Sequence, residues 1–371
     1  MAAVKTHVGM LFWLAVGTLL IVAAPPTRAA SPPSVVAPDV PVPAYLNVTY
    51  NASTDGFPLS YEEWRPAGFN ASDPHPLLVY LHGLEGAKGH PVSGGVRSDF
   101  LRMLSLRSIE GATARGVVEN ASLNGYVVIA PNSRTAGGYF VNSPCGGPQE
   151  QDVLDAIASI RSFANVSSVY LLGFSMGSIG AFSLAAHHPA LFDGIAVVAP
   201  VIDMFEESAW AAHQAALGAG WAIGGTNAFA ALTCGNATAS VPLLNYLSVV
   251  RFAPENLSGV RVWIAAGGID LLAPNNGSDW AYLQVNNSFV NSTCTVEATG
   301  LEPANCTTTF QALHQLLPRM FQFRYVYEAL APHNIAQLSP ADMFAFFGRS
   351  APGGYFEAPF PPTTITAAPT P

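Results

Sequence analysis

Short runs of apolar residues alternate along this chain with longer segments of helical periodicity. The apolar runs are rich in β-branched and aromatic residues, which favour strands. They predict strands at PLLVYLHG (76–83), GYVVIAPN (125–132), SVYLLGFS (168–175), GIAVVAP (194–200), VRVWIAAGG (260–268) and FQFRYVYEAL (321–330). Several of these runs are apolar at every position, which predicts a sheet buried on both faces.

Helices that could cover such a sheet are predicted between the strands, at QDVLDAIASIRSFA (151–164), GSIGAFSLAAHH (177–188) and PADMFAFFGR (340–349). Strands that alternate with helices favour an α/β fold with a mostly parallel central sheet and helices on both faces. NVTY (47–50) and a segment around Tyr61 predict antiparallel edge strands. The acids Glu150 and Asp152, in a first helical turn, and the histidines His187 and His188, at a helix end, are explained by the helix dipole.

The pattern predicts one α/β domain over residues 47–350. Residues 204–258 interrupt the alternation with Ala, Gly and aromatic residues and predict a lid or cap. The flanking segments 31–46 and 351–371 are rich in proline, which cannot donate to a backbone ladder, so they predict an extended stem and a disordered tail.

Residues 1–30 have the pattern of a signal peptide: Lys5, an uncharged run from Val8 to Ala24, and small residues before position 30. The alternative is an uncleaved signal anchor, because the run approaches the length of a membrane span. No other segment has the pattern of a membrane span, so the sequence predicts a secreted protein.

Composition narrows the function classes. Of 371 residues, 50% are hydrophobic and only 11% are charged, and the net charge is −9. These values predict a buried core and disfavour nucleic acid as a partner. A high density of Asn-X-Ser/Thr sequons predicts N-glycosylation, which would hydrate a surface so poor in charge. The sequons begin at Asn47, Asn51, Asn70, Asn120, Asn165, Asn236, Asn256, Asn276, Asn286, Asn291 and Asn305.

The chain has 4 cysteines, Cys145, Cys234, Cys294 and Cys306. An even number in an oxidising compartment favours a pair of disulfides over free buried thiols. Cys294 and Cys306 share one short polar stretch and form the preferred local pair, which leaves Cys145 for Cys234.

The candidate chemistry centres on Ser175. The residues Gly173-Phe174-Ser175-Met176-Gly177 lie between a predicted strand and a predicted helix. This is the setting of a nucleophile elbow, in which a strained turn exposes the serine hydroxyl and glycines on either side avoid collisions with strand and helix. The motif therefore predicts Ser175 as a nucleophile.

At this motif the chain resembles the secreted esterase branch of the α/β hydrolases, which includes feruloyl and acetylxylan esterases, polyhydroxybutyrate depolymerases and single-domain relatives of prolyl oligopeptidase. The likeness is strongest at LVYLHG (78–83), at the run 173–200 and at WIAAGGIDLLAP (263–274). It extends over about residues 77–347. The chain departs from the family over 85–125, in the possible lid, and in the cysteine loop 294–306, which puts the substrate class in doubt.

The resemblance implies an oxyanion hole made of two backbone amides. One is the N–H of Met176, directly after the nucleophile, and the other is the N–H of Leu84 in the His-Gly turn after the first predicted strand. His82 precedes the nucleophile in the chain, whereas this fold orders its triad as serine, acid, histidine. We therefore expect His82 to be a structural hydrogen-bonding residue rather than a base.

The same order predicts His333, between the last strand and the last helix, as the general base. His314 is the other late histidine, but the leucines around it have helical spacing and predict a packing residue. The acid that orients the base should follow a strand, as Asp270 does after 260–268. Asp203 is the alternative, one strand earlier, and Asp279 is better explained as a residue at a helix start.

The sequence thus predicts a secreted α/β-hydrolase that cleaves carboxylic esters, small or polymeric, through an acyl-enzyme. It contains no Walker loop or zinc motif, and we expect no cofactor or metal. A secreted serine peptidase shares all these catalytic parts and stays a possible alternative. A catalytically silent hydrolase fold used in adhesion is the third, which the intact catalytic set disfavours.

Overall fold

The computed structural model describes residues 43–83, 91–92, 95–96, 98–134, 140–143, 147–200, 257, 260–267, 297–298, 323–328 and 333–348. All of them belong to one compact unit, Asp39–Pro371. The signal peptide, most of the stem and the tail lie outside the described residues, and so do all four cysteines. Of the predicted lid, only Leu257 is described.

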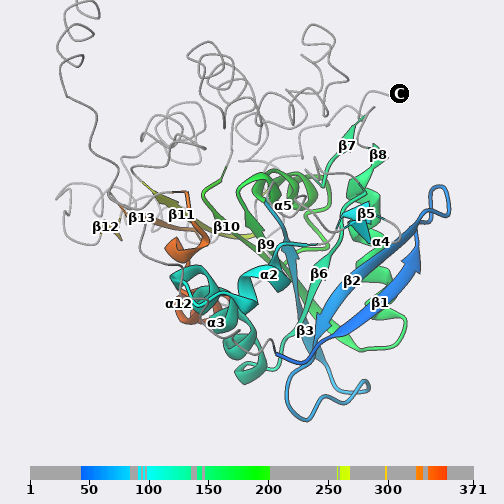
Figure 1. Cartoon of the computed structure of the whole chain (residues 1–371), viewed down its shortest axis with the longest axis horizontal. Coiled ribbons are helices and arrows are strands. Elements are labelled where there is room, and N and C mark those ends of the chain that lie inside the picture. The colour runs from blue at the N-terminus through cyan, green and yellow to red at the C-terminus, as the bar shows by residue number, and fades with distance from the viewer. Residues whose placement is uncertain are drawn as a thin grey trace, which may run out of the picture. The chain divides into compact units, whose positions relative to one another are not determined.

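A 9-stranded sheet forms the centre of this unit, in the order β1-β2-β6-β3-β9-β10-β11-β13-β12 (Figure 1). From β6 to β12 every neighbouring pair is parallel, whereas β1 and β2 add an antiparallel edge. The strands are β1 (Leu46–Asn51), β2 (Pro58–Trp64), β3 (His75–Leu81), β6 (Val127–Pro131), β9 (Val166–Phe174), β10 (Gly194–Val198), β11 (Arg261–Gly267), β12 (Glu297–Ala298) and β13 (Phe323–Glu328). The six predicted strands and the antiparallel edge are confirmed.

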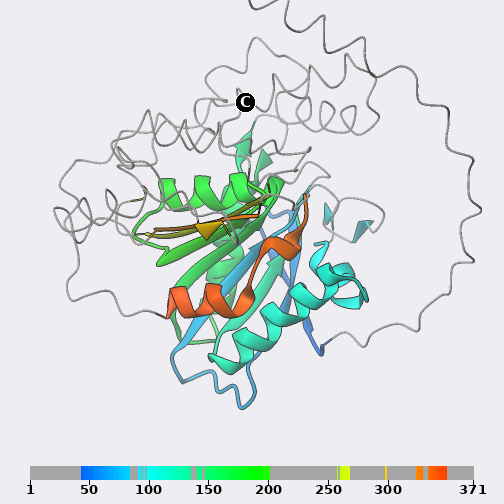
Figure 2. The same ribbon diagram turned by 90° about the vertical axis from the view of Figure 1, so that its left-hand side faces the viewer.

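Helices cover both faces of the sheet (Figure 2). One face packs against α4 (Gln149–Arg161) and α5 (Met176–His187), and the other against α2 (Phe100–Ser105), α3 (Ile109–Leu123), the short 3-10 helix η4 (Ile335–Gln337) and α12 (Pro340–Phe347). Two small antiparallel pairs complete the described elements, β4 (Pro91–Val92) with β5 (Gly95–Val96) and β7 (Asn142–Ser143) with β8 (Gly147–Pro148).

Strand β3 shows why the apolar runs are continuous. Leu77, Val79 and Leu81 lie in the cluster under α4 and α5, whereas Leu78 and Tyr80 lie in the cluster under α2 and α3. Successive side chains of a strand point to opposite faces, so a strand covered on both sides needs apolar residues at every position. These five side chains are fully buried.

The sequence analysis missed α3. Its residues include two glycines, and Thr113 donates its hydroxyl to the carbonyl of Ile109, a bond that competes with the helical backbone pattern. The helix is capped by the side chain of Ser108, which accepts from the N–H of Gly111. Ala114, Val117 and Ala121 are buried against the sheet. Tertiary packing therefore outweighs a weak local preference for helix.

Within the described ranges, no helix combines the length and hydrophobicity needed to cross a bilayer. The described sequons occupy accessible positions: Asn47, Asn51, Asn70 and Asn165 are exposed and Asn120 is half-buried. The Nδ2 atom of Asn120 donates to the carbonyl of Gly116. The remaining sequons lie outside the described residues, and glycosylation stays a prediction.

A buried carboxylate joins the start of α4 to the end of α5. Both oxygens of Glu150 lie 3.0 Å from Nδ1 of His187, and Oε1 lies 2.9 Å from Nε2 of His188. Burial by itself raises the pKa of Glu150, but the hydrogen bonds and charges of the two histidines together lower this pKa to about 2. These residues thus have specific partners, beyond the helix dipole that the sequence analysis considered.

This pKa predicts how stability depends on pH. The folded-state pKa of Glu150 lies below its ordinary value of 4.5, so the ionised carboxylate stabilises the fold at pH values above its ordinary pKa. We expect this contribution to be lost as the pH falls from about 5 to about 2. Chemical unfolding across this range should show a shallower loss of stability in Glu150→Gln, which should also be less stable at pH 7. The exposed Glu119→Gln should follow the wild type, and equal slopes for Glu150→Gln and the wild type would contradict the prediction.

Candidate active site

Ser175 occupies a one-residue turn between β9 and α5. Its backbone has φ 53° and ψ −119°, a left-handed conformation that costs a non-glycine residue of the order of 1–3 kcal/mol. The N–H of Ser175 donates to the carbonyl of Val198 at the end of β10 at 2.9 Å. The turn is therefore held by a neighbouring strand as well as by its own helix, and it has the strained geometry that the sequence predicted.

Two glycines make this turn possible. A Cβ added at Gly173 would lie 2.6 Å from the carbonyl oxygen of Gly177, and one added at Gly177 would overlap the carbonyl oxygen of Leu81 on β3. No side chain fits at either position without moving backbone. The glycine pattern around Ser175 thus follows from the close approach of α5 to the ends of β9 and β3.

The structure brings Ser175 and His333 together across 158 positions of sequence. Nε2 of His333 lies 2.7 Å from Oγ of Ser175, which is hydrogen-bonding distance. The imidazole packs against the ring of Phe174, with 5.4 Å between the ring centroids. Both side chains are half-buried, so a hydroxyl and a potential proton acceptor meet at a site that a substrate can reach.

The acid of the predicted triad, Asp270, lies outside the described residues, as does its alternative Asp203. Strand β11 ends at Gly267, three residues before Asp270, and is parallel to β13, after which His333 follows. The carboxyl ends of parallel strands lie at one edge of a sheet. This topology is compatible with either acid, and their roles stay predictions.

One predicted oxyanion donor, Met176, follows Ser175 in the chain, and the strand that precedes the other lies beside β9. Met176 is the first residue of α5, where a backbone N–H has no acceptor within the helix. On the other side, β3 pairs with β9 so that Leu81 lies beside Gly173. A Cβ at Gly83 would be 3.3 Å from the Cβ of Ser175, so the His-Gly turn lies against the serine. Leu84 itself lies outside the described residues.

His82 is fully buried beneath this turn. Its Nδ1 lies 2.8 Å from the carbonyl oxygen of Gly83 and its Nε2 lies 2.9 Å from Oγ of Ser133. Burial lowers the pKa of His82 to about 4, so the ring is neutral at physiological pH. These contacts agree with the hydrogen-bonding role that we expected for His82. The histidine that contacts Ser175 is His333.

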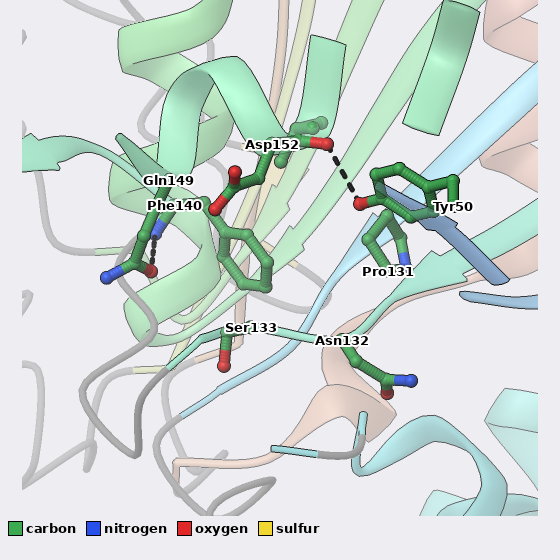
Figure 3. Close-up of a pocket in the computed structure, with 8 residues that line it drawn as sticks. Tyr50, Pro131, Asn132, Ser133, Phe140, Gln149 and Asp152 are labelled. Carbon is green, nitrogen blue, oxygen red and sulfur yellow. Dashed lines mark hydrogen bonds between the residues drawn. The ribbon is translucent and has the colours of Figure 1, made fainter. Parts of the chain in front are cut away.

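The sequence analysis did not find the residues that surround His82. Ser133 follows β6, and Phe140 packs edge-on against the imidazole with centroids 4.8 Å apart. Phe140 has φ 56°, and its N–H donates to Oε1 of Gln149 at the start of α4 (Figure 3). The three come from separate segments and form no motif, so sequence spacing could not have indicated them.

Arg134, which follows Ser133 in the sequence, joins the β1–β2 turn to the start of α4. Its Nε and Nη2 donate to the carboxylate of Asp152 at 2.6 and 2.7 Å, and Nη1 donates to Asp55 at 2.6 Å. The hydroxyl of Tyr50 donates to the main-chain carbonyl of Asp152 (Figure 3). These bonds fasten the antiparallel edge to the first turn of α4. Asp152 is thus an ion-pair partner as well as a first-turn acid.

Among the described residues, no group of three or more His, Cys, Asp and Glu side chains is arranged so that it could hold a metal ion. What this part of the chain does contain is a strained serine, a histidine within hydrogen-bonding distance, and the backbone N–H of Met176 next to the serine. Such a set can transfer an acyl group without a cofactor.

Residues 76–240 match the model of a family described as alpha/beta hydrolase fold. No curated protein matches the sequence. Puromycin hydrolase aligns at 13% identity and a TM-score of 0.50, over 82% of this chain and 37% of its own. Brefeldin A esterase, a bacterial homologue of human hormone sensitive lipase, aligns at 14% identity and 0.49, over 86% of this chain and 78% of its own.

FphF, a fluorophosphonate-binding serine hydrolase of Staphylococcus aureus, aligns at 16% identity and a TM-score of 0.47, over 82% of this chain and 96% of its own. The chain spans less than two thirds of other structures that it matches, 36% of one and 62% of another. At these identities the likeness concerns the fold. The strand order, the helices on both faces and the family match together show that this chain has the α/β-hydrolase fold, and they support a place in the α/β-hydrolase superfamily.

Proposed function

We propose that this protein is a serine hydrolase that cleaves carboxylic esters through an acyl-enzyme. The observation that carries the proposal is the 2.7 Å contact between Nε2 of His333 and Oγ of Ser175, at a strained turn between a parallel strand and a helix. A serine hydroxyl is a weak nucleophile unless an adjacent base takes its proton. The contact supplies that base.

In the proposed reaction, Oγ of Ser175 attacks the ester carbonyl carbon while its proton passes to Nε2 of His333. The carbonyl oxygen gains negative charge, which the N–H groups of Met176 and Leu84 bind. The bond to the alcohol oxygen then breaks, and His333 returns the proton to the leaving alcohol. In the second half, His333 takes a proton from water, which attacks the acyl carbon. The bond between that carbon and Oγ of Ser175 then breaks, His333 returns the proton to Oγ, and the carboxylic acid leaves.

Asp270 is the proposed acid for this histidine. A carboxylate at Nδ1 would hold the imidazole in the tautomer that leaves Nε2 free to accept, and it would stabilise the imidazolium that forms. The parallel pairing of β11 and β13 supports this assignment, because both segments end at the edge where Ser175 lies.

We propose an ester rather than an amide as the substrate because three stretches of the sequence resemble secreted esterases. They are residues 78–83, 173–200 and 263–274. The leader pattern at 1–30 and the exposed sequons Asn47, Asn51, Asn70 and Asn165 support a secreted glycoprotein. Turnover of p-nitrophenyl esters should exceed that of peptide anilides. The opposite ranking would favour a serine peptidase.

Covalent labelling tests the assignment of the nucleophile. A fluorophosphonate probe phosphonylates a serine only where the site activates it, so the wild type should be labelled and Ser175→Ala should not. Peptide mapping of the labelled protein should locate the adduct on Ser175. Equal labelling of both proteins, or an adduct on another residue, would overturn the proposal.

A further inference from the structure

We propose that N-linked sugars on Asn47 and Asn51 protect the outer edge of the sheet and prevent a second copy of this chain from pairing with β1. This inference rests on the secreted glycoprotein of the proposed function and goes beyond the proposed reaction, because it assigns a task to two particular sequons. Both asparagines lie on the same six-residue strand.

Strand β1 forms one end of the described sheet. It pairs with β2 on one side, and the strand order begins with it (Figure 1). Every second residue of such a strand directs its backbone N–H and C=O away from the sheet. These groups can form hydrogen bonds with a strand of another molecule and so extend the sheet across two chains. An edge without protection is therefore a site of association.

The usual features that prevent edge pairing are charged residues, prolines and bulges, and β1 has none of them. Residues 44–53 include neither a charged residue nor a proline. The pairing with β2 runs from Leu46 to Asn51 without a register shift. Tyr45 and Leu46, which are large and apolar, are 39% and 45% exposed. The composition of β1 thus favours pairing, so any protection comes from another source.

The two sequons place sugars beside this edge. Successive side chains of a strand alternate between the faces of the sheet, so Asn47, Thr49 and Asn51 share one face. Val48 and Tyr50 lie on the other face and pack against the cluster under α4 and α5. Asn47 and Asn51 are exposed, and among the described residues neither side-chain amide has a hydrogen-bond partner. A sugar on Nδ2 therefore breaks no bond of the fold.

The modification transfers an oligosaccharide from a lipid diphosphate to the side-chain amide. Nδ2 forms a bond to the anomeric carbon of the first sugar while the bond from that carbon to the diphosphate breaks, and one amide proton leaves with the diphosphate. Thr49 and Ser53 supply the hydroxyls that complete the sequons at Asn47 and Asn51. The product side chain is uncharged, so the sugars act by their bulk and hydration.

Pairing with a second copy would bring the sugars of both chains together. Two β1 edges related by a two-fold axis pair antiparallel, and residues directly opposite each other then lie on the same face. With Thr49 at the axis, Asn47 of each copy lies opposite Asn51 of the other, and the Cβ atoms of such a pair are about 5 Å apart. Two oligosaccharides do not fit in that space. Copies with sugars therefore cannot pair at β1, whereas copies without them can.

Two variants without sugars on β1 test this role in a eukaryotic secretory host. Thr49→Ala and Thr49→Lys both destroy the sequon at Asn47, and Asn51→Gln removes the other, so the two double variants differ at one side chain. We expect Thr49→Ala/Asn51→Gln to associate, with its mass in light scattering approaching twice that of the monomer at about 100 µM, because so short an edge is a weak interface. Thr49→Lys/Asn51→Gln should stay monomeric, because its lysines would face each other across the axis.

Further variants separate the position of the sugars from their number. Asn47→Gln/Asn51→Gln removes the same sugars with Thr49 in place and should also associate. Asn70→Gln/Asn165→Gln removes two sugars from the segments before β3 and β9 and should stay monomeric, as should Thr49→Ser, which retains its sequon. Removal by mutation is needed because enzymatic hydrolysis of the sugar–asparagine bond leaves aspartate, which would itself place charge on the edge.

Hydrogen exchange shows whether β1 is the surface that pairs. In the associated variants, the outward backbone amides of residues 46–51 should exchange at least about tenfold more slowly than in the glycosylated monomer, because they gain hydrogen bonds. All variants should keep the kcat of the wild type, because β2, β6 and β3 separate β1 from β9 and the serine that follows it.

Peptide mass spectrometry of the wild type shows whether Asn47 and Asn51 carry sugars. The inference would be overturned if both were bare in a protein glycosylated elsewhere, if the variants without β1 sugars stayed monomeric, or if they associated without slower exchange in β1. A wild type without sugar at any sequon would overturn both this inference and the proposed secretion as a glycoprotein. Failure of the wild type to label at Ser175 would overturn the proposed reaction alone.

Discussion

Replacing His333 by alanine is expected to lower kcat/KM for p-nitrophenyl acetate by about 10⁴- to 10⁶-fold. Nε2 of His333 is 2.7 Å from the serine hydroxyl, and without this base the hydroxyl stays protonated during attack. The same base is needed again to activate water in deacylation. Both halves of the reaction therefore fail together.

The decisive measurement compares His333→Ala, Ser175→Ala and the double variant. Residues that act as one unit are strongly non-additive, so the double variant should be no slower than either single variant. His75→Ala serves as the control, because His75 lies at the start of β3, where its ring bonds to the carbonyls of Gly125 and Asn70 and stacks on Phe69. Additive losses, or a His333→Ala enzyme within tenfold of the wild type, would show that the pair does not work as a unit.

Gly177→Ala is expected to prevent correct folding, or to reduce the free energy of unfolding by at least about 3 kcal/mol. Its new methyl group would overlap the carbonyl oxygen of Leu81 and crowd that of His82, both of which are backbone atoms. Relief requires α5 to move away from β3. That movement would also displace Ser175, so any folded variant should have lost most of its activity.

Gly116→Ala is the matched control for this substitution. Gly116 is also a helical glycine, but its new Cβ would meet only the Pro340 side chain, at 3.2 Å. Alanine is the better helix former by up to about 1 kcal/mol, so this variant should be close to the wild type in stability. Thermal and urea unfolding of the two variants check the prediction. A Gly177→Ala protein as stable and active as Gly116→Ala would contradict the packing described for the elbow.

The local pattern was sufficient for much of the fold. Strands β3, β6, β9, β10, β11 and β13 were predicted from runs rich in β-branched and aromatic residues, and several of these runs are apolar at every position because both faces of the sheet are covered. Gly173-Phe174-Ser175-Met176-Gly177 was recognisable because the strained turn at Ser175 and the two glycines that it needs lie within five residues, although Gly177 is also required by the nearby backbone of β3. By contrast, α3 could not be predicted, since its residues favour a helix only when Ala114 and Val117 meet the sheet.

By itself, then, the sequence determined the α/β architecture and the turn at Ser175. It also indicated that the histidine base should come after the serine in the chain, behind the last strand. Only the tertiary structure decided that His333 reaches Ser175, that His82 faces Gly83 and Ser133, and that Glu150 bridges His187 and His188. The physical reason is the separation along the chain over which each kind of interaction acts. Periodicity and turn strain act between residues close in the chain, whereas a hydrogen bond between distant residues depends on how the sheet and helices pack.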